Sequence, residues 1–429
     1  MFILILTATV DYFVGFWIYY LESLWKKRFL LILSLTVNLG YLFYYKYATF
    51  LMHIFGVKEI FADTFIDKIL FPIGMSFFVF KSLTYIFDIY RKTIDIPEYN
   101  YINYLLYVSF FPNILAGPIS KARDLLPQLK AKHDITEDEI GRGIFLIMSG
   151  AIKKFFIADF LAINFIDRIF DSPSLFGGFE NLMAAFGALI QIYCDFSGYT
   201  DIVIGLACLM GFTIKPNFNK PFLSQNITEF WRRWHMTLSS WMSDYLFYPL
   251  SYFFRRLKMI GVILAVLITF FISGLWHGAN WTFVLWGCSH GFAIAFETWT
   301  KNLRYKIFGK INQRFYKISS IIITLNFLVF TIILFRASDI NKAFEMYKII
   351  FTRFDVSIIS NWIHVYFYPL LVLLLGYILH FLPQKLNDNL TLKFISLPWI
   401  LKSVIFFIVI VIIYQTFSSE ALPFVYLEF

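Results

Sequence analysis

The sequence predicts an all-α polytopic membrane protein with about eleven membrane segments, some of them re-entrant or interfacial. Of its 429 residues, 59% are hydrophobic and only 15% are charged, whereas soluble proteins carry roughly 25% charged residues. Apolar runs of about 20 residues, long enough to cross a bilayer as helices, recur from end to end. Since no Pro/Gly/Ser-rich or charged linker separates these runs, we expect one membrane-embedded domain over residues 1–429.

The charge and cysteine content exclude several other classes of protein. The net charge of +9 indicates cytoplasmic loops rich in Lys and Arg rather than nucleic-acid binding. The odd number and apolar surroundings of Cys194, Cys208 and Cys288 argue against a disulfide framework. There is no CxxC or similar spacing, so we expect no metal and no bound cofactor. The N-terminus lacks a basic region followed by a small-residue cleavage site, so no cleavable signal is expected.

Five apolar runs in the first half of the chain are predicted to cross the membrane. Basic clusters at 26–28 and 91–92 mark the cytoplasmic side. The acidic loop that ends at Lys68 is then expected outside. In chain order the predicted crossings are residues 1–20, 29–55, 69–90, 139–168 and 181–212. Within the fourth, Lys153 and Lys154 are expected to be buried or to snorkel towards the interface.

The apolar run 101–119 is predicted not to cross. Basic segments flank it on both sides, at 91–92 and in "KARDLLPQLKAK" (121–132), and one crossing cannot join two cytoplasmic loops. Pro112, Gly117 and Pro118 interrupt its end. Irregular backbone at membrane depth is tolerated only where protein shields it, so we interpret the run as re-entrant or interfacial.

The segment 213–244 is too polar to span the membrane. Asn226, with Glu229 three residues later, has the pattern of a helix N-cap and its partner. The short helix that follows is amphipathic and is expected to lie in the interface or to dip into the core. This helix is predicted to carry Trp231, Arg232, Arg233, Trp234 and His235.

The segment 259–296 contains no charged residue and predicts a helical hairpin with arms of about 25 Å. Its turn is expected at Gly274, His277 and Gly278, with both ends inside next to the basic segments 255–258 and 301–314. Later apolar runs are 316–335, 361–381 and 399–417.

The histidine in this turn is the main candidate for catalysis. An ionisable side chain in the membrane is costly unless it faces a cavity or a partner, and an imidazole can take and return a proton near neutral pH. We expect His277 to face a cavity and to contribute little packing. The alternative is a histidine hydrogen-bonded between helices.

The other candidates also have structural alternatives. His235 is a supporting candidate, or part of an interfacial helix whose Arg232 and Arg233 bind lipid headgroups. His290 is more naturally a core histidine. Cys288 could carry an acyl group, but the sequence gives it no activating neighbour beyond His290.

A polar cluster interrupts the apolar run "IYCDFSGYTDIVIG" (192–205). Carboxylates within the membrane are functional candidates by default, so Asp195, with Ser197 and Thr200, is compatible with a cation site of a transporter. The alternative is structural: Asp195 and Asp201 would brace a helix broken near Gly198.

Five stretches of the chain carry a resemblance to known proteins. They are "FPIGMSFFVFKSLTYIFDIYR" (71–91), "YVSFFPNILAGPIS" (107–120), "QIYCDFSGYTDIVIGLACLMGF" (191–212), "ITEFWRRWHMTLSSWMSDYLFYPL" (227–250) and "SGLWHGANWTFVLWGCSHG" (273–291). Taken together, they resemble the membrane-bound O-acyltransferase family and, within it, the bacterial branch that O-acetylates alginate. The branch that transfers D-alanine to teichoic acids is also similar. The stretches occur in the family order, and the last 120 or so residues match only in hydropathy.

The resemblance implies roles for individual residues. His277, in "GLWHG", matches the catalytic histidine of the family, and His235, in "WRRWH", matches its second functional histidine. Trp276 and Trp281 are expected to wall the cavity. Further candidate substrate-binding residues are Asn280, Arg232, Arg233 and Asp195. Family members usually carry one more hydrophobic segment before "VDYFVGFWI", and this chain begins almost there, which leaves the orientation of residue 1 open.

The resemblance also implies a function and partners. An acyl group, acetyl in the first place, would pass from acetyl-CoA or another cytoplasmic acyl thioester to a hydroxyl of an envelope or exported polysaccharide. The transfer would be direct or through an extracytoplasmic SGNH-type transferase, and the protein would lie in the cytoplasmic (inner) membrane. Two alternatives stay open: D-alanyl transfer to teichoic acid, and a transporter or flippase of envelope precursors, although no inverted repeat is visible.

Overall fold

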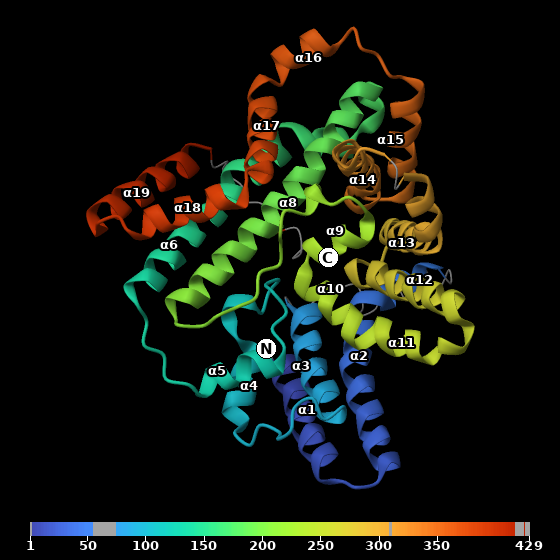
Figure 1. The fold of residues 1–429 in the computed structure, drawn as a ribbon, viewed down its shortest axis with the longest axis vertical. Coiled ribbons are helices and arrows are strands. Elements are labelled where there is room, and N and C mark those ends of the chain that lie inside the picture. The colour runs from blue at the N-terminus through green and yellow to red at the C-terminus, as the bar shows by residue number, and fades with distance from the viewer. Residues whose placement is uncertain (1, 55–73, 309–310, 417–423, 425–429) are drawn as a thin grey trace. The chain divides into compact units, whose positions relative to one another are not determined.

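The computed structural model describes residues 2–54, 74–308, 311–416 and 424, and every regular element among them is helical (Figure 1). The chain forms two compact units, residues 1–135 with 210–215, and residues 136–209 with 216–429. The predicted external loop that ends at Lys68 lies outside the described residues. The expectation of a single membrane-embedded domain stays a prediction.

The first unit is organised around a buried carboxylate. Its helices are α1 (Phe2–Tyr20), α2 (Leu24–Ile54), α3 (Met75–Tyr90), α4 (Tyr101–Ser109) and α5 (Ala122–Lys130). Asp11 of α1 is fully buried and accepts hydrogen bonds from Ser34 (2.5 Å), Asn38 (2.7 Å) and Ser82 (2.5 Å). Because buried polar groups need partners, this network ties α2 and α3 to α1. Among the described residues, helices lie in all three runs predicted to cross here, and two of them, α1 and α2, are long and apolar enough to span a membrane.

The run 101–119 does not form a crossing helix, as predicted. With nine residues, α4 is roughly 14 Å long, less than half of a hydrocarbon core of about 30 Å. A 3-10 turn, η3 (Phe111–Asn113), and irregular backbone follow. The buried Asn113 accepts a hydrogen bond from the Lys81 ammonium (3.0 Å) and donates to the Pro118 carbonyl (2.9 Å). Protein groups thus shield and satisfy this irregular backbone.

The second unit is built on a long helix, α8 (Gly178–Leu209), that packs against the segment preceding it. The alternative of a helix broken near Gly198 is wrong, because α8 passes through Gly198 without interruption. A Cβ atom at Gly198 would lie 2.6 Å from the Gly150 carbonyl oxygen, and one at Gly205 would lie 2.6 Å from that of Gly143. Gly198 therefore permits close approach of two helix backbones rather than a break. The preceding segment comprises α6 (Glu137–Ala151), the π-helical η4 (Ile152–Asp159) and η5 (Ala162–Ile166), and α7 (Asp167–Asp171).

Ion pairs join the same two segments. Lys154 lies 2.5 Å from Asp195 and 2.8 Å from Asp159, and the Lys154 and Asp195 side chains are each only 1% exposed. Lys153 lies 2.6 Å from Asp201. Both aspartates of the polar cluster therefore have lysine partners on η4, and Lys154 is buried rather than snorkelling.

The rest of the second unit is a series of helices, several of them short. They are α9 (Ile227–Arg233), α10 (Met236–Met242), α11 (Tyr248–Phe253), α12 (Lys258–His277), α13 (Trp281–Phe308), α14 (Gln313–Arg336), α15 (Ile340–Thr352), α16 (Ile359–Val365), α17 (Phe367–Phe381), α18 (Gln384–Ile395) and α19 (Trp399–Thr416).

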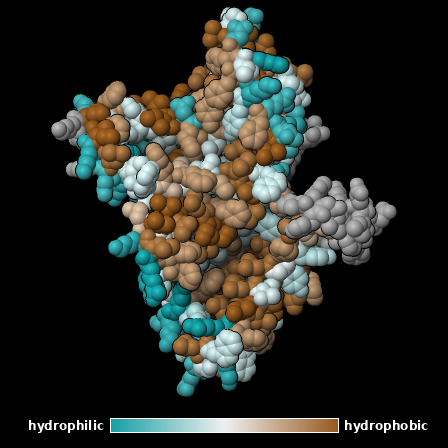
Figure 2. Space-filling model, turned by 90° about the vertical axis from the view of Figure 1, so that its right-hand side faces the viewer, coloured by the Kyte–Doolittle hydropathy of each residue, from teal (hydrophilic) through white to brown (hydrophobic). Residues whose placement is uncertain are grey.

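Five described helices, α1, α2, α8, α12 and α14, are long and apolar enough to cross a membrane. Helices α16 and α17 form a sixth crossing if the pair, bent by 90°, counts as one span. The predicted count of about eleven segments is therefore not confirmed. Figure 2 shows broad hydrophobic areas on the face in view, as expected for a surface that meets lipid.

Candidate functional site

The predicted hairpin is confirmed. Its first arm, α12, ends at His277, a turn covers 278–280, and α13 starts at Trp281. The second arm continues to Phe308 and includes half of the segment expected to be a basic loop. A Cβ at Gly274 would lie 2.5 Å from the Phe283 carbonyl oxygen, so the two arms touch through their backbones next to the turn.

The turn is also attached to the start of α15. The Asn280 side-chain NH2 donates to the Ser338 backbone carbonyl (3.0 Å), and its side-chain oxygen accepts from the Thr282 backbone N–H (3.1 Å). Asp339, the next residue after Ser338, caps α15, and the hydrogen bond from the Lys342 amide lowers the pKa of its carboxyl. Asn280 therefore positions the turn, while its contact with substrate stays a prediction.

His277 is enclosed by aromatic rings from three helices. It is 2% exposed, and its ring centroid lies 4.9 Å from Trp276, 4.9 Å from Trp286 and 5.4 Å from Phe335. The expectation that this side chain contributes little packing is wrong, because rings on α12, α13 and α14 surround it. The imidazole instead lies in a dense apolar environment that shields it from bulk water.

His235 lies between two short helices rather than within one, which corrects the expected helix through Trp234 and His235. Helix α9 ends at Arg233, and His235 adopts a left-handed conformation with φ 42° and ψ 51°. The cause is tertiary: the Met236 amide donates to the backbone oxygen of Asn217, and the Thr237 hydroxyl donates to its side chain at 2.6 Å. These bonds draw the chain out of helical conformation after Arg233.

One tryptophan ring contacts both candidate histidines. The Trp276 ring centroid lies 4.9 Å from His277 and 6.5 Å from His235. His235 is fully buried and also contacts the Phe196 ring at 4.7 Å. The structure thus brings together His277, His235 and Trp276, as the sequence motifs imply. Trp281 is 50% exposed at the start of α13, so its expected role as a cavity wall remains a prediction.

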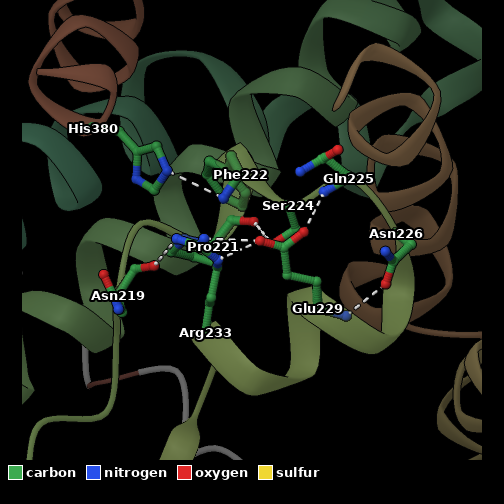
Figure 3. A network of polar contacts seen from close by, with 9 residues as sticks. All are labelled: Asn219, Pro221, Phe222, Ser224, Gln225, Asn226, Glu229, Arg233 and His380. Carbon is green, nitrogen blue, oxygen red and sulfur yellow. Dashed lines mark hydrogen bonds and ion pairs between the residues drawn. The ribbon is translucent and has the colours of Figure 1, made fainter. Parts of the chain in front are cut away.

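A network of polar contacts fixes α9 (Figure 3). The predicted N-cap is confirmed: Asn226 accepts from the Glu229 amide at 2.8 Å. The Glu229 side chain accepts from the Gln225 amide, one residue before the cap, and forms an ion pair with Arg233 at 2.8 Å. Figure 3 shows these last two side chains pointing towards each other. Arg233 is therefore engaged within α9, whereas Arg232 is exposed.

A second cap on α9 was not predicted. The Glu297 carboxylate of α13 accepts from the Ile227 amide (2.6 Å) and from the Thr228 amide and hydroxyl (3.0 and 2.7 Å). The one available signal was that Glu297 is the first charged residue after the uncharged hairpin. Together with the Asn217 contacts, this cap determines where the His235 segment is held.

A cavity of about 530 Å³ lies between α9–α10 and the hairpin. Arg232 and Met236 line one side, next to His235 in sequence. Helix α12 contributes Val262, Val266, Thr269, Phe270 and Ser273. This spacing places them on one face of α12, and His277 is the next residue on that face, one turn beyond Ser273. The cavity lining therefore ends one helical turn before His277, and neither histidine is part of it. The expectation that His277 faces a cavity stays a prediction.

The remaining candidates lie beside this group. His290 is buried and accepts a hydrogen bond from the Trp231 indole N–H at 3.2 Å, in agreement with a core histidine. Asp195 precedes Phe196 in α8 but points to Lys154. Among the described residues, no group of three or more His, Cys, Asp or Glu side chains could hold a metal ion.

Comparison with known proteins shows that the candidate site lies in the part of the chain that matches a protein family. The profile of the membrane-bound O-acyltransferase family matches residues 74–338, which include both histidines. A protein of Azotobacter vinelandii described as a probable alginate O-acetylase is 37% identical over 334 residues, which cover 76% of this chain and 63% of the relative.

Two relatives with other described functions are also similar. A peptidoglycan O-acetyltransferase of Helicobacter pylori is 31% identical over 377 residues, covering 81% of this chain and 69% of the relative. A teichoic acid D-alanyltransferase of Bacillus subtilis is 31% identical over 277 residues, covering 61% of this chain and 68% of the relative. The chain thus spans about three fifths of the length of its alginate-type relative.

Proposed function

This chain belongs to the membrane-bound O-acyltransferase family, and from this membership we propose that it transfers acetyl from a cytoplasmic thioester to a hydroxyl of an envelope or exported polysaccharide. Acetyl-CoA is the proposed donor, with no bound cofactor. The proposed acceptor is reached directly or through an SGNH-type transferase outside the cytoplasmic membrane. The similar proteins of Azotobacter vinelandii and Helicobacter pylori are both named for O-acetyl transfer, which supports acetyl as the transferred group.

The observation that carries this proposal is the enclosed imidazole of His277 at the end of the cavity face of α12. In the proposed reaction His277 takes the proton of the acceptor hydroxyl, while the hydroxyl oxygen forms a bond to the carbonyl carbon of the thioester. The carbon–sulfur bond then breaks, and His277 returns the proton to the leaving thiolate. General acid–base catalysis of this kind contributes typically 10²–10⁴-fold in rate. The surrounding rings would limit access of water, and hence hydrolysis of the thioester.

The neighbouring residues have supporting roles in this proposal. His235 orients the acyl group or the acceptor, and the Trp276 ring between the two imidazoles keeps them at a defined separation. The cavity would admit the acyl end of the donor. Arg232, exposed on its lining, and the basic segments expected on the cytoplasmic side would attract the phosphates of coenzyme A.

The proposal is tested by following donor and acceptor together in membranes that contain the protein and its polysaccharide. Radiolabelled acetyl-CoA should lose its label to ester-linked acetate on the glycan, and His277→Gln should abolish this transfer. Unchanged transfer by His277→Gln would refute the mechanism. A transporter of envelope precursors would instead consume no thioester. The engagement of Asp195 and Asp201 with lysines favours a structural role for the aspartates over a relay in such a transporter.

D-alanyl transfer is the second candidate function, because the Bacillus relative is described as a teichoic acid D-alanyltransferase. The same assay separates the two candidates when a D-alanyl thioester replaces acetyl-CoA. Transfer of label from the D-alanyl donor alone would assign this chain to that reaction.

A further inference from the structure

A second cavity, of about 680 Å³, lies away from the histidines in the second unit. Phe156, Phe160, Asn164 and Arg168 line one of its walls at a regular spacing of four residues, so they share one face of the helical segment η4–α7. The other wall is the bend between α16 and α17 and the first half of α17. The cavity is therefore a groove between two helical segments.

The groove has an apolar end and a polar end. Gly376 of α17 lies near Ile157, with its Cβ position 3.3 Å from that side chain. At the opposite end, the Tyr366 ring lies 5.0 Å from the Phe165 ring. The two walls are thus antiparallel, with Phe156 and Leu375 at one end and Arg168 and Tyr366 at the other.

The dimensions of the groove match one leaflet of a bilayer. The twelve-residue step from Phe156 to Arg168, part of it π-helical, spans at most roughly 18 Å, and half of a hydrocarbon core is about 15 Å. An arginine at the bilayer centre is costly, so the Arg168 end belongs at the interface. Tyr366 and Tyr368 line the groove at the same end, and the membrane interface is where such aromatic side chains are enriched.

Arg168 is available to an anionic ligand. It is exposed, and over the described ranges it forms no ion pair, although Asp167 is its neighbour. Asp167 is engaged instead by Arg336 at 2.5 Å. The nearby Glu180 carboxylate accepts a hydrogen bond from the Gly177 amide. A guanidinium without a protein counter-ion, at the end of an apolar groove, is suited to a phosphate.

We propose that this groove binds an anionic glycerophospholipid of the bilayer, with one acyl chain along the apolar stripe and its phosphate at Arg168. The bound lipid fills the space beside α17, whose Tyr377 hydroxyl donates to the Phe186 carbonyl of α8 at 2.9 Å. Binding therefore stabilises the packing of α17 on α8. The inference is independent of the acyl-transfer reaction.

Native mass spectrometry and thermal unfolding of the full chain in detergent test the proposal. Phosphatidylglycerol should remain bound to the wild type and raise its unfolding temperature, whereas glycerol phosphate without acyl chains should do neither. Arg168→Gln should weaken phosphatidylglycerol binding about five- to tenfold, and Arg168→Lys should restore most of it. Leu375→Trp fills the apolar end and should reduce binding with Arg168 intact.

The matched control is Arg314→Gln, since Arg314 is exposed at the start of α14 and does not line the groove. It should bind phosphatidylglycerol as the wild type does. The proposal is wrong if Arg168→Gln and Leu375→Trp retain the lipid and its thermal effect. It is also wrong if glycerol phosphate alone reproduces the effect, because the ligand would then be a free phosphate.

Discussion

At the scale of single residues, the rings around His277 determine how its proposed role is best tested. Truncation to alanine would leave a cavity among Trp276, Trp286 and Phe335 and reduce stability as well as activity. His277→Gln keeps most of the volume and removes the base. We expect acetylation to fall on the order of 10²–10⁴-fold, measured as ester-linked acetate per folded molecule. Wild-type acetylation by this variant would exclude His277 as the base.

The backbone at His235 sets a second residue-scale prediction. Its positive φ of 42° suits asparagine and disfavours β-branched residues. His235→Asn should therefore fold and show reduced transfer, less impaired than His277→Gln because an orienting group is partly replaceable. His235→Val should lower the unfolding temperature as well. Equal thermal stability of the two variants, measured in detergent, would contradict the strain argument.

The buried ion pair at Asp195 gives a stability prediction. Asp195→Asn leaves the buried Lys154 with Asp159 as its remaining acidic partner, and breaking a buried pair costs up to about 3–5 kcal/mol. We expect expression and unfolding temperature to fall more than turnover per folded molecule. The control is Asp134→Asn, whose pair with Lys132 is exposed on both sides and should cost about 1 kcal/mol or less. A stable but inactive Asp195→Asn would place this carboxylate in the reaction.

At the scale of elements, close glycine contacts hold α6 against α8. Gly205→Ala would put a methyl carbon 2.6 Å from the Gly143 carbonyl oxygen, and overpacking typically costs about 1–3 kcal/mol. The matched control is Gly40→Ala in α2, where nothing lies within 4 Å of the added carbon. Because alanine favours helix by about 1 kcal/mol over glycine, this control should be neutral or stabilising. Thermal unfolding that ranks the two variants in the reverse order would refute the packing role.

At the scale of the whole molecule, the basic segments predict which parts of the chain face the cytoplasm. Single cysteines placed at 26–28, 121–132, 255–258 and 311–314, in a background without the native cysteines, should react with a membrane-impermeant reagent only from inside. Positions 255–258 lead into the first hairpin arm, α12, which starts at Lys258. Positions 311–314 follow the second arm, α13, and lead into α14, which starts at Gln313. Labelling of 311–314 from outside in intact cells would overturn the predicted topology.

Several features could be predicted because their causes are local in sequence. The class of membrane protein follows from apolar runs separated by basic clusters. The hairpin turn at His277 follows from the uncharged segment 259–296 and its central glycines. The Asn226 cap requires only a side chain that reaches an amide three residues later. In each case the residues that decide the structure lie within one or two helices.

Other features depend on segments far apart in the chain, and the tertiary structure alone decides them. The left-handed turn at His235 results from the hydrogen bonds that Met236 and Thr237 donate to Asn217. Likewise, Glu297 caps α9 from α13, the second arm of the hairpin, about 70 residues later in the chain. Gly198 looks like a helix break in isolation, yet it is a contact point because Gly150 lies against it. Sequence spacing cannot show these contacts, because a buried group takes its partner from whichever segment folding brings near.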